Sequence, residues 1–234
     1  FGAGASRVNG RVLEEVEAHG KHLLYHFSGR RSVHVHLGLV GTFHTHREPA
    51  PAPSPATRMV LRNQRGAAYL TGPMTCTLMD RTATLRVLDP LGPDPLVRGT
   101  RVGAFLRRID GDRRPIGTVL LDQTVVAGIG NVYRSEILFM EGIDPRRSPS
   151  DLDTGALGDV WRRSRDLLRV GLDLGRIVTV SPRLVGAASR REIPRGLAVY
   201  AYDREHRPCR VCATPIRATD LGGRRLWWCP GCQG

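Results

Sequence analysis

The sequence predicts an α+β protein built of three parts, and three observations support this prediction. Residues 1–92 hold short runs of alternating apolar and polar residues between turn residues, a pattern typical of β-strands. Residues 93–196 hold longer segments with apolar residues at helical spacing. Residues 197–234 contain two Cys-x-x-Cys pairs, which predict a small hairpin held together by a metal ion. We expect domain boundaries between these ranges, the first near the Gly- and Pro-rich segment 92–95.

The composition indicates a polyanionic partner. The chain has 234 residues and a formal net charge of +13. This charge favours nucleic acid over a membrane surface, because no amphipathic basic helix accompanies it. No run approaches the roughly 18 apolar residues of a membrane span, and no signal peptide is recognised. We expect a cytoplasmic, nucleoid-associated protein, and we expect it to be a monomer.

One basic residue differs from all the others. Of the 35 lysine and arginine residues, only Lys21 is a lysine. An ammonium group can lose its proton and act as an acid, a base or a nucleophile, whereas a guanidinium group stays charged. The pattern predicts a chemical role for Lys21. The alternative is that one lysine persists by chance in an arginine-biased sequence.

The first part contains several predicted strands. Strands are expected over 11–16 and 22–27, and a third over 33–37, where alternate residues are apolar and share one face. Shorter strands are expected at 59–61 and 67–70. Together these strands predict a β-rich domain over 1–92.

An apolar pair, Leu39 and Val40, lies between Gly38 and Gly41, and we expect an exposed loop tip there. In a basic protein such a tip is suited to insertion as a wedge into stacked DNA bases. The alternative is a hairpin whose leucine folds back onto the core.

Two His-x-His pairs, His34/His36 and His44/His46, each place two imidazole groups on one face of a strand, as metal ligation would require. No cysteine accompanies them, and Glu48 is the only acid nearby. We therefore interpret them as solvent-facing strand histidines rather than as metal ligands.

The segment Asp122–Phe139 (DQTVVAGIGNVYRSEILF) predicts two helices joined by a two-glycine turn. The apolar run at 120–127 predicts a packed helix end. Gly128 and Gly130 then allow backbone conformations that a side chain would hinder.

Asn131 follows the turn directly and is a preferred N-cap residue. Residues 132–140 predict a half-buried helix that Gly142 closes. Free N–H groups at the start of such a helix form a site for a phosphate group. The alternative is an ordinary helical hairpin in which the glycines only make the turn tight.

Two further helices are predicted, over 102–109 and over 154–172. The second has apolar residues at helical spacing, which indicates a core-facing stripe. Residues 181–196 are basic and rich in glycine and proline, so they either close over a ligand or serve as a linker.

The four cysteines of the third part give the most specific metal signal. Cys209 and Cys212 are separated by sixteen residues from Cys229 and Cys232, a spacing that suits one tetrahedral Zn²⁺. Disulfides are the alternative, but they are rare inside cells. The hairpin has few apolar residues, so we expect the metal to stabilise it. Arg224 lies near the hairpin turn, where its guanidinium group can reach a phosphate.

Taken together, these segments resemble the formamidopyrimidine-DNA glycosylase and endonuclease VIII family over nearly the whole chain. DQTVVAGIGNVYRSEILF is similar to the family's helix–two-turn–helix signature, and CRVCATPIRATDLGGRRLWWCPGCQ is similar to its zinc finger. GKHLLYHF and HVHLGLVG resemble paired strands of its first domain. The resemblance implies a β-rich N-terminal sandwich domain, a helix–two-turn–helix domain and a C-terminal four-cysteine zinc-finger hairpin.

The resemblance also implies a base-excision repair enzyme that acts on damaged double-stranded DNA. The family flips a damaged nucleotide out of the duplex, cleaves its glycosidic bond through a Schiff base, and cuts the strand by β/δ-elimination as an AP lyase. Flipping is required because the target carbon cannot be reached in stacked DNA. Oxidised pyrimidines are favoured as the lesions, because Arg134 and the first-domain strands resemble the endonuclease VIII side, and purine lesions such as formamidopyrimidines stay open.

The resemblance assigns catalytic roles to two residues of this chain. Lys21 matches a charged general acid that also contacts phosphate, and Glu136 matches a supporting glutamate near the catalytic pair. In the family the nucleophile is the amine of an N-terminal proline, which a glutamate follows. The chain begins at Phe1, and we expect the Pro-Glu pair and a first helix to precede it.

Four further residues match positions that contact DNA. Leu39 matches the residue that fills the gap left by the flipped base, and Asn131 matches a phosphate-binding asparagine. Arg134 matches an arginine seen in endonuclease VIII, and Arg224 matches the zinc-finger arginine that grips the backbone. The zinc ligands are matched by Cys209, Cys212, Cys229 and Cys232.

Two other classes of function stay open. Without the Pro-Glu pair, the better interpretation is a protein that binds damaged or abasic DNA without chemistry. An RNA-binding structural protein with a similar helical hairpin is the second alternative, and the four-cysteine hairpin and β-rich first part disfavour it.

Overall fold

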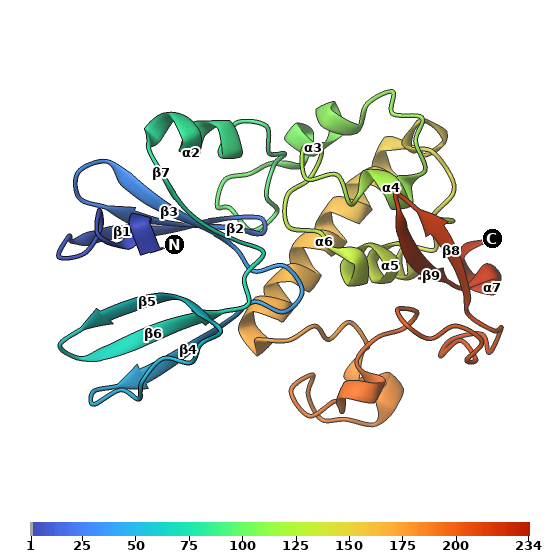
Figure 1. Cartoon of the computed structure of the whole chain (residues 1–234). Helices are drawn as coiled ribbons and strands as arrows, with labels where there is room; N and C mark the ends of the chain where they lie inside the picture. The colour runs from blue at the N-terminus through green and yellow to red at the C-terminus, as the bar shows by residue number, and fades with distance from the viewer. Residues whose placement is uncertain (1) are drawn as a thin grey trace. The chain divides into compact units, whose positions relative to one another are not determined.

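The computed structural model describes residues 2–234 and divides into two compact units, unit 1 over 1–90 and unit 2 over 91–234. Unit 1 is β-rich, whereas unit 2 is mostly helical and ends in a hairpin (Figure 1). The predicted α+β class is therefore confirmed. A division of unit 2 at residue 196 stays a prediction. Among the described residues, no helix is both long and apolar enough to cross a membrane.

Unit 1 is a sandwich of two antiparallel sheets (Figure 1). One sheet has the strand order β1-β2-β3-β7, and the other has the order β4-β6-β5. The strands are β1 (Leu13–His19), β2 (His22–Phe27), β3 (Arg31–His36), β4 (Thr42–Arg47), β5 (Thr57–Asn63), β6 (Gly66–Thr71) and β7 (Thr75–Met79).

The sandwich core is made by side chains of both sheets. Phe27, Val33 and Val35 of the first sheet pack with Met59 and Leu70 of the second. The alternation of β3 causes this arrangement, because successive side chains of a strand point to opposite faces. The predicted strands at 22–27 and 33–37 therefore correspond closely to β2 and β3.

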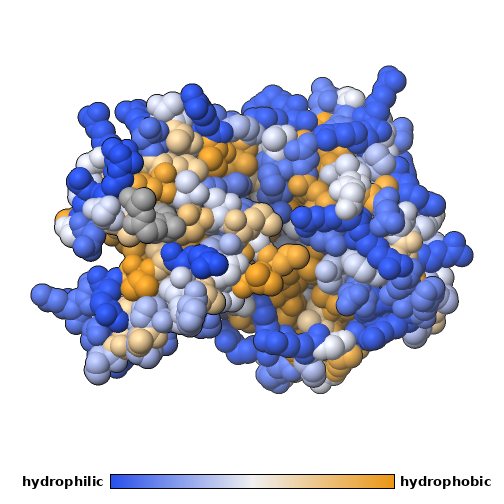
Figure 2. Space-filling view, in the orientation of Figure 1, coloured by the Kyte–Doolittle hydropathy of each residue, from blue (hydrophilic) through white to orange (hydrophobic). Residues whose placement is uncertain are grey.

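Two helices belong to unit 1: α1 (Gly2–Ala5) and α2 (Arg81–Leu88). The carboxylate of Asp80 caps α2 by accepting a hydrogen bond from the N–H of Ala83 over 2.8 Å. In Figure 2, apolar surface is visible on unit 1 between its two sheets, whereas hydrophilic side chains cover most of the other surface in that view.

Unit 2 is built around one apolar core. The stripe of α6 (Thr154–Leu174) is buried there, with Val160, Trp161 and Leu167 almost inaccessible, as the sequence predicts. Asp153 caps α6, and Gly175, with φ of 64°, ends it. The other elements are α3 (Val102–Ile109), α4 (Ile116–Val119), α5 (Asn131–Met140), α7 (Pro230–Gln233), the 3₁₀ turns η1 (Pro149–Asp151), η2 (Pro182–Val185) and η3 (Arg195–Leu197), and the hairpin strands β8 (Arg217–Leu221) and β9 (Arg224–Trp228).

The segment 120–127 does not continue a helix, so that prediction is wrong. Helix α4 ends at Val119, and the chain then turns back. The main chain pairs elsewhere: the N–H of Gly92 donates to the carbonyl of Gln123, and the N–H of Ala127 donates to that of Pro93. These two bonds join residues that are far apart in the sequence, and they take the place of helical hydrogen bonds. The local apolar pattern does not indicate such long-range bonds.

Candidate nucleic-acid interface

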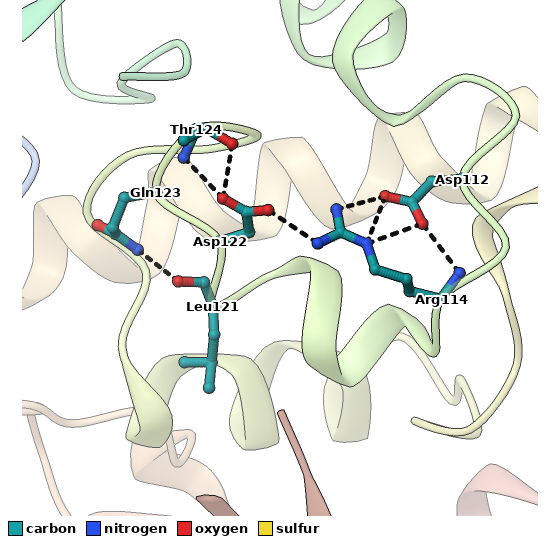
Figure 3. Close-up of polar contacts among 6 residues, drawn as sticks. All are labelled: Asp112, Arg114, Leu121, Asp122, Gln123 and Thr124. Carbon is teal, nitrogen blue, oxygen red and sulfur yellow. Dashed lines mark hydrogen bonds and ion pairs between the residues drawn. The ribbon is translucent and has the colours of Figure 1, made fainter. Parts of the chain in front are cut away.

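The two-glycine turn of unit 2 is braced by the amide side chain of Gln123. Its Nε2 donates to the carbonyl oxygens of Leu121 and Ile129, both over 3.0 Å. Its Oε1 accepts a hydrogen bond from the N–H of Gly128 over 3.0 Å. Gly128 has φ of 94°, a conformation that favours glycine. The glutamine thus fixes both sides of the turn, and Figure 3 shows its bond to Leu121.

A polar cluster next to Gln123 holds the start of the same turn (Figure 3). The guanidinium of Arg114 bridges Asp112 over 2.6 Å and Asp122 over 2.9 Å. Asp122 also accepts hydrogen bonds from the N–H and hydroxyl of Thr124. Hydrogen bonds from Arg114 hold the pKa of Asp112 below its usual value. At Asp122, partial burial raises the pKa. Hydrogen bonds from Thr124 and Arg114 outweigh this burial, so the pKa of Asp122 is also lowered.

Helix α5 begins directly after this turn. Its N-cap is Gly130, so the prediction of Asn131 as the N-cap is wrong, and Asn131 is the first helical residue. The asparagine amide instead donates to the carbonyl of Arg225 over 2.9 Å and accepts from Nε of Arg134 over 2.9 Å. Among residues 2–234, no hydrogen bond takes up the N–H groups of Asn131 and Val132. The helix start therefore keeps donors for a phosphate.

Arg134 is fully buried, which alters the role expected for it. Its Nη1 donates to the carbonyls of Gly117 over 2.6 Å and Leu221 over 2.9 Å, and its Nη2 donates to that of Arg224 over 2.9 Å. Burial, together with the nearby charge of Arg224, lowers the pKa of Arg134 to about 10. The group therefore stays charged at neutral pH. Its geometry favours positioning of the hairpin turn over direct contact with DNA.

The hairpin β8–β9 presents Arg224 at its turn, as the sequence predicts. Leu221 pairs with Arg224 across the turn, where Gly222 and Gly223 have φ of 63° and 69°. The side chain of Arg224 is exposed, whereas Leu226 is buried in the core of unit 2. The hairpin is thus anchored by its apolar face, and its turn lies beside the start of α5.

The four cysteine sulfurs of unit 2 form a cluster suited to a metal ion. Cys209, Cys212, Cys229 and Cys232 have sulfur atoms within 4.8 Å of one another. Cys209 Sγ and Cys232 Sγ are 3.8 Å apart, and Cys212 Sγ and Cys229 Sγ are 3.4 Å apart. Four sulfurs bound at about 2.3 Å around a tetrahedral ion would be roughly 3.8 Å apart. All four are free thiols, so the predicted metal cluster is supported over disulfides.

Glu136 is also fully buried, five residues after Asn131 on α5. Its carboxylate accepts hydrogen bonds from the N–H groups of Tyr200, Ala201 and Tyr202 over 2.7 to 2.8 Å, and from the hydroxyl of Thr179. The carboxylate therefore has a complete set of donors within unit 2. This geometry suits a residue that fixes the chain at 200–202 rather than one that transfers a proton.

In unit 1, Lys21 lies at the turn between β1 and β2, after Gly20, whose φ is 56°. The next residue, His22, shares a hydrogen bond with His34, with Nδ1 of His22 and Nε2 of His34 2.9 Å apart. The ring of His36 lies edge-on to that of His22, with centroids 5.3 Å apart. The sequence pattern did not reveal that β2 adds a third imidazole to the His34/His36 pair.

His34 does not face solvent as predicted and His36 is half-buried, whereas His44 of the second pair is exposed. His34 is only 5% exposed, because its side of β3 is covered. Burial, reinforced by His34 and His36, lowers the pKa of His22 to about 4. Burial also lowers the pKa values of His34 and His36. The three histidines are therefore neutral at physiological pH. The positive charge next to His22 in the sequence is that of Lys21.

The loop tip of unit 1 is apolar and exposed, as predicted. Leu39 is 92% exposed and Val40 is 74% exposed. Met74, also exposed, lies next to Gly38: a Cβ on that glycine would be 3.0 Å from the methionine Cβ. Met74 is not among the residues predicted from the sequence, although its place after a Gly-Pro pair is a signal of an exposed turn. We name Leu39, Val40 and Met74 the apolar tip.

Two models of known protein families match the chain. Residues 91–182 match the formamidopyrimidine-DNA glycosylase H2TH domain, and residues 2–75 match the formamidopyrimidine-DNA glycosylase N-terminal domain. Among related sequences, a Mycobacterium tuberculosis protein named Endonuclease 8 1 is 40% identical, with 100% of this chain and 88% of the relative covered. A formamidopyrimidine-DNA glycosylase of Moorella thermoacetica is 34% identical, with 88% and 76% covered.

Solved structures are similar over almost the same length. The MutM (Fpg) protein of Thermus thermophilus aligns with a TM-score of 0.75 at 30% identity, covering 96% of this chain and 84% of that one. A Lactococcus lactis Fpg in complex with abasic-site DNA aligns with a TM-score of 0.78 at 20% identity, covering 98% and 84%. The second similarity is one of fold.

Proposed function

The chain belongs to the formamidopyrimidine-DNA glycosylase and endonuclease VIII family, and from this premise we propose that it excises oxidised bases from duplex DNA. The proposal rests on the junction in unit 2 where the turn of the β8–β9 hairpin meets the start of α5. The exposed Arg224 lies on the hairpin, and the free N–H groups lie at the helix start. Hydrogen bonds of Asn131 and Arg134 join the two segments. Such a junction offers several donors to one stretch of phosphate backbone.

Unit 1 supplies the groups that we propose to act at the extruded nucleotide. The apolar tip of Leu39, Val40 and Met74 would enter the gap that the flipped base leaves, as apolar wedges do in other DNA-bending proteins. Lys21 would contact phosphate and act as a charged acid, because its neighbours in the His22 cluster are neutral.

We propose one Zn²⁺ as the metal of the cysteine cluster. Four thiolates at tetrahedral spacing suit zinc, and such closed sites are structural. The ligands would be Cys209, Cys212, Cys229 and Cys232. The ion would hold the hairpin that presents Arg224.

The finer chemistry is also part of the proposal. We propose that the protein is bifunctional, with AP lyase activity through a Schiff base and β/δ-elimination. We also propose that it prefers oxidised pyrimidines and acts as a monomer in the cytoplasm. The preference is supported by the 40% identity to a protein named Endonuclease 8 1, against 34% to one named formamidopyrimidine-DNA glycosylase.

The test is borohydride trapping of the full-length protein on duplexes that carry an oxidised pyrimidine, an oxidised purine or an abasic site. A covalent adduct and a cleaved strand are expected, with faster excision of the pyrimidine. Tight binding of all three duplexes without adduct or cleavage would instead support a non-catalytic damaged-DNA binder. Mass spectrometry of peptides from the trapped adduct identifies the nucleophile.

A further inference from the structure

Three imidazole groups lie together on one face of the first sheet of unit 1, and none of the roles above explains why. Val33 and Val35 take the core side of β3, so His34 and His36 lie on its other side. His36 is paired with His22 of β2 across the sheet, which makes His34 the diagonal neighbour of His22. The register of two strands therefore brings the three rings together.

The hydrogen bond between His22 and His34 couples the tautomers of these two rings. Nδ1 of His22 and Nε2 of His34 are 2.9 Å apart, so one of the two nitrogens carries the shared proton. Burial lowers the pKa values of both residues, so both rings are neutral at pH 7. In a neutral imidazole one nitrogen is a donor and the other is an acceptor. The direction of the bond therefore fixes the state of all four nitrogens.

The surroundings of His34 decide the direction of this bond. His34 is only 5% exposed, and its Nδ1 is buried without a hydrogen-bond partner among the described residues. An N–H group at that atom would be an orphaned buried donor, which is rare in proteins, whereas an acceptor without a partner is tolerated more often. His34 therefore keeps Nδ1 unprotonated, and its Nε2–H donates to Nδ1 of His22.

This bond leaves the Nε2–H group of His22 as a donor that can reach a ligand. His22 is half-buried, and among residues 2–234 its Nε2 forms no hydrogen bond and is not enclosed. Besides burial, the charge of Lys21 contributes to the lowered pKa values of His22 and His36, so the ammonium group lies near both rings. A neutral N–H donor therefore lies close to the charged group of Lys21.

We propose that His34 is a positioning residue that fixes the tautomer of His22, and that His22 thereby presents its Nε2–H to an oxygen of the DNA sugar-phosphate chain. The donor adds directional selection to the charge of Lys21, because an N–H···O bond depends on its angle. An ammonium group attracts a phosphate as a point charge. The inference rests on the proposed function in taking DNA as the ligand.

The first test measures the tautomer in the free full-length protein at neutral pH. Long-range proton–nitrogen correlation spectra of histidine labelled with nitrogen-15 distinguish a protonated Nε2 from a protonated Nδ1. We expect the Nε2–H form for His22 in the wild type, and a mixture of both forms in H34L, which lacks the donor. H34Q places an amide N–H near the position of Nε2, so it should restore the wild-type form. A wild-type spectrum with His22 protonated at Nδ1 would overturn the proposal.

The second test measures binding to a duplex that carries a stable tetrahydrofuran analogue of an abasic site. The matched control is H46L, which removes the half-buried imidazole that packs against Tyr69 in the other sheet. We expect H34L to bind about fivefold more weakly than H46L, the effect of one ordinary hydrogen bond. H34Q should bind like the wild type. The salt slope should be the same for all variants, because none of them removes a charge.

The variant H22Q separates the tautomer from packing. Glutamine places an N–H group near the position of Nε2 and has no tautomer to fix, so H22Q/H34L should bind as tightly as H22Q. A further loss in the double variant would overturn the proposal, because His34 would then act through packing. Equal affinities of H34L and H46L would also overturn it, as would a lower salt slope for H34L, because His22 would then be charged.

Base excision is scored separately on duplexes that carry a lesion. A protein without excision in which His34 still controls the tautomer of His22 and the affinity for the abasic-site duplex would refute the proposed function and leave this inference standing.

Discussion

The side-chain amide of Asn131 donates a hydrogen bond to the main-chain carbonyl of Arg225 over 2.9 Å, although 94 residues separate them in the sequence. This bond joins the first residue of α5 to the strand that carries the exposed Arg224. The helix start and the hairpin turn are therefore held together. The buried Arg134 strengthens this connection by donating hydrogen bonds to the carbonyls of Leu221 and Arg224. Predictions about DNA contact and about stability both follow from this junction.

Replacement of Arg134 is expected to destabilise unit 2. In Arg134→Ala the carbonyls of Gly117, Leu221 and Arg224 lose their donor, at a cost of about 3 kcal/mol in the free energy of unfolding. Arg134→Lys should recover little, because an ammonium group cannot reproduce the fork of a guanidinium. Urea unfolding measures the loss, with the exposed Arg162→Lys as control. Wild-type stability of Arg134→Lys would show that the fork is dispensable.

Arg224→Ala is expected to weaken binding to lesion-containing duplexes without unfolding the protein. Its side chain is exposed at the hairpin turn, so the variant removes one bond to phosphate and the salt slope of the binding constant falls by about one. The control is Arg217→Ala, an exposed arginine on the other strand of the hairpin. Titrations at several salt concentrations give the slope. An unchanged affinity and slope would remove Arg224 from the interface.

Lys21→Ala is expected to lower base excision more than DNA binding. As a charged acid, the ammonium group would act in the chemical step, whereas a phosphate contact alone would affect affinity. Single-turnover excision and equilibrium binding on the same duplex separate the two effects. Equal losses in both measurements would mean that Lys21 is only a phosphate contact.

Removal of the metal is expected to release the hairpin. Without an ion, the thiols of Cys209, Cys212, Cys229 and Cys232 lose the bonds that close the segment. Metal analysis should give one Zn²⁺ per chain, and a chelator should increase hydrogen exchange in β8 and β9 and weaken DNA binding. Adding Zn²⁺ back should restore both. Unaltered exchange after complete zinc removal would mean that apolar packing alone holds the hairpin.

Stability is expected to fall on acidification, because of the His22 cluster. The folded pKa of His22 is about 4, against 6.5 for an unperturbed histidine. Below pH 6.5, His22 of the unfolded chain therefore binds a proton, whereas His22 of the folded chain binds one only near pH 4. The neighbouring groups His19, Lys21, His34 and His36 all oppose a further charge there.

The stabilising contribution of neutral His22 to the free energy of unfolding is therefore complete above pH 6.5 and is lost progressively between pH 6.5 and 4. Urea unfolding across this range measures it. His22→Gln should flatten the dependence, whereas His206→Gln, whose side chain is 88% exposed, should leave it unchanged. Identical pH profiles for His22→Gln and the wild type would exclude the cluster as the cause.

Several features of the fold could be predicted from local sequence. The alternation around Val33 and Val35 places two side chains on one face of β3, and that face became the core. The glycines at 38 and 41 indicated an exposed tip, and Leu39 is exposed. The spacing of Cys209, Cys212, Cys229 and Cys232 indicated a metal cluster, since it needs only two short turns to bring four thiols together.

Other features depend on contacts between distant segments. Local sequence could not predict that Arg134 and Glu136 are buried, because the carbonyl of Leu221 and the N–H of Tyr202 that bind them lie 87 and 66 residues away. The third imidazole of the His34 cluster likewise comes from the neighbouring strand. Burial decides whether a charged side chain meets solvent, DNA or main chain, and burial is set by packing.

The amino-acid order by itself determined the secondary structure of most elements, the metal cluster and the excess of positive charge, because turns, periodicity and composition act over a few residues. Only the tertiary structure decided which arginines are free to reach a phosphate and which are held inside. Arg224 and Arg134 are chemically identical side chains, and they differ in role because one lies at a solvent-exposed turn and the other beneath it.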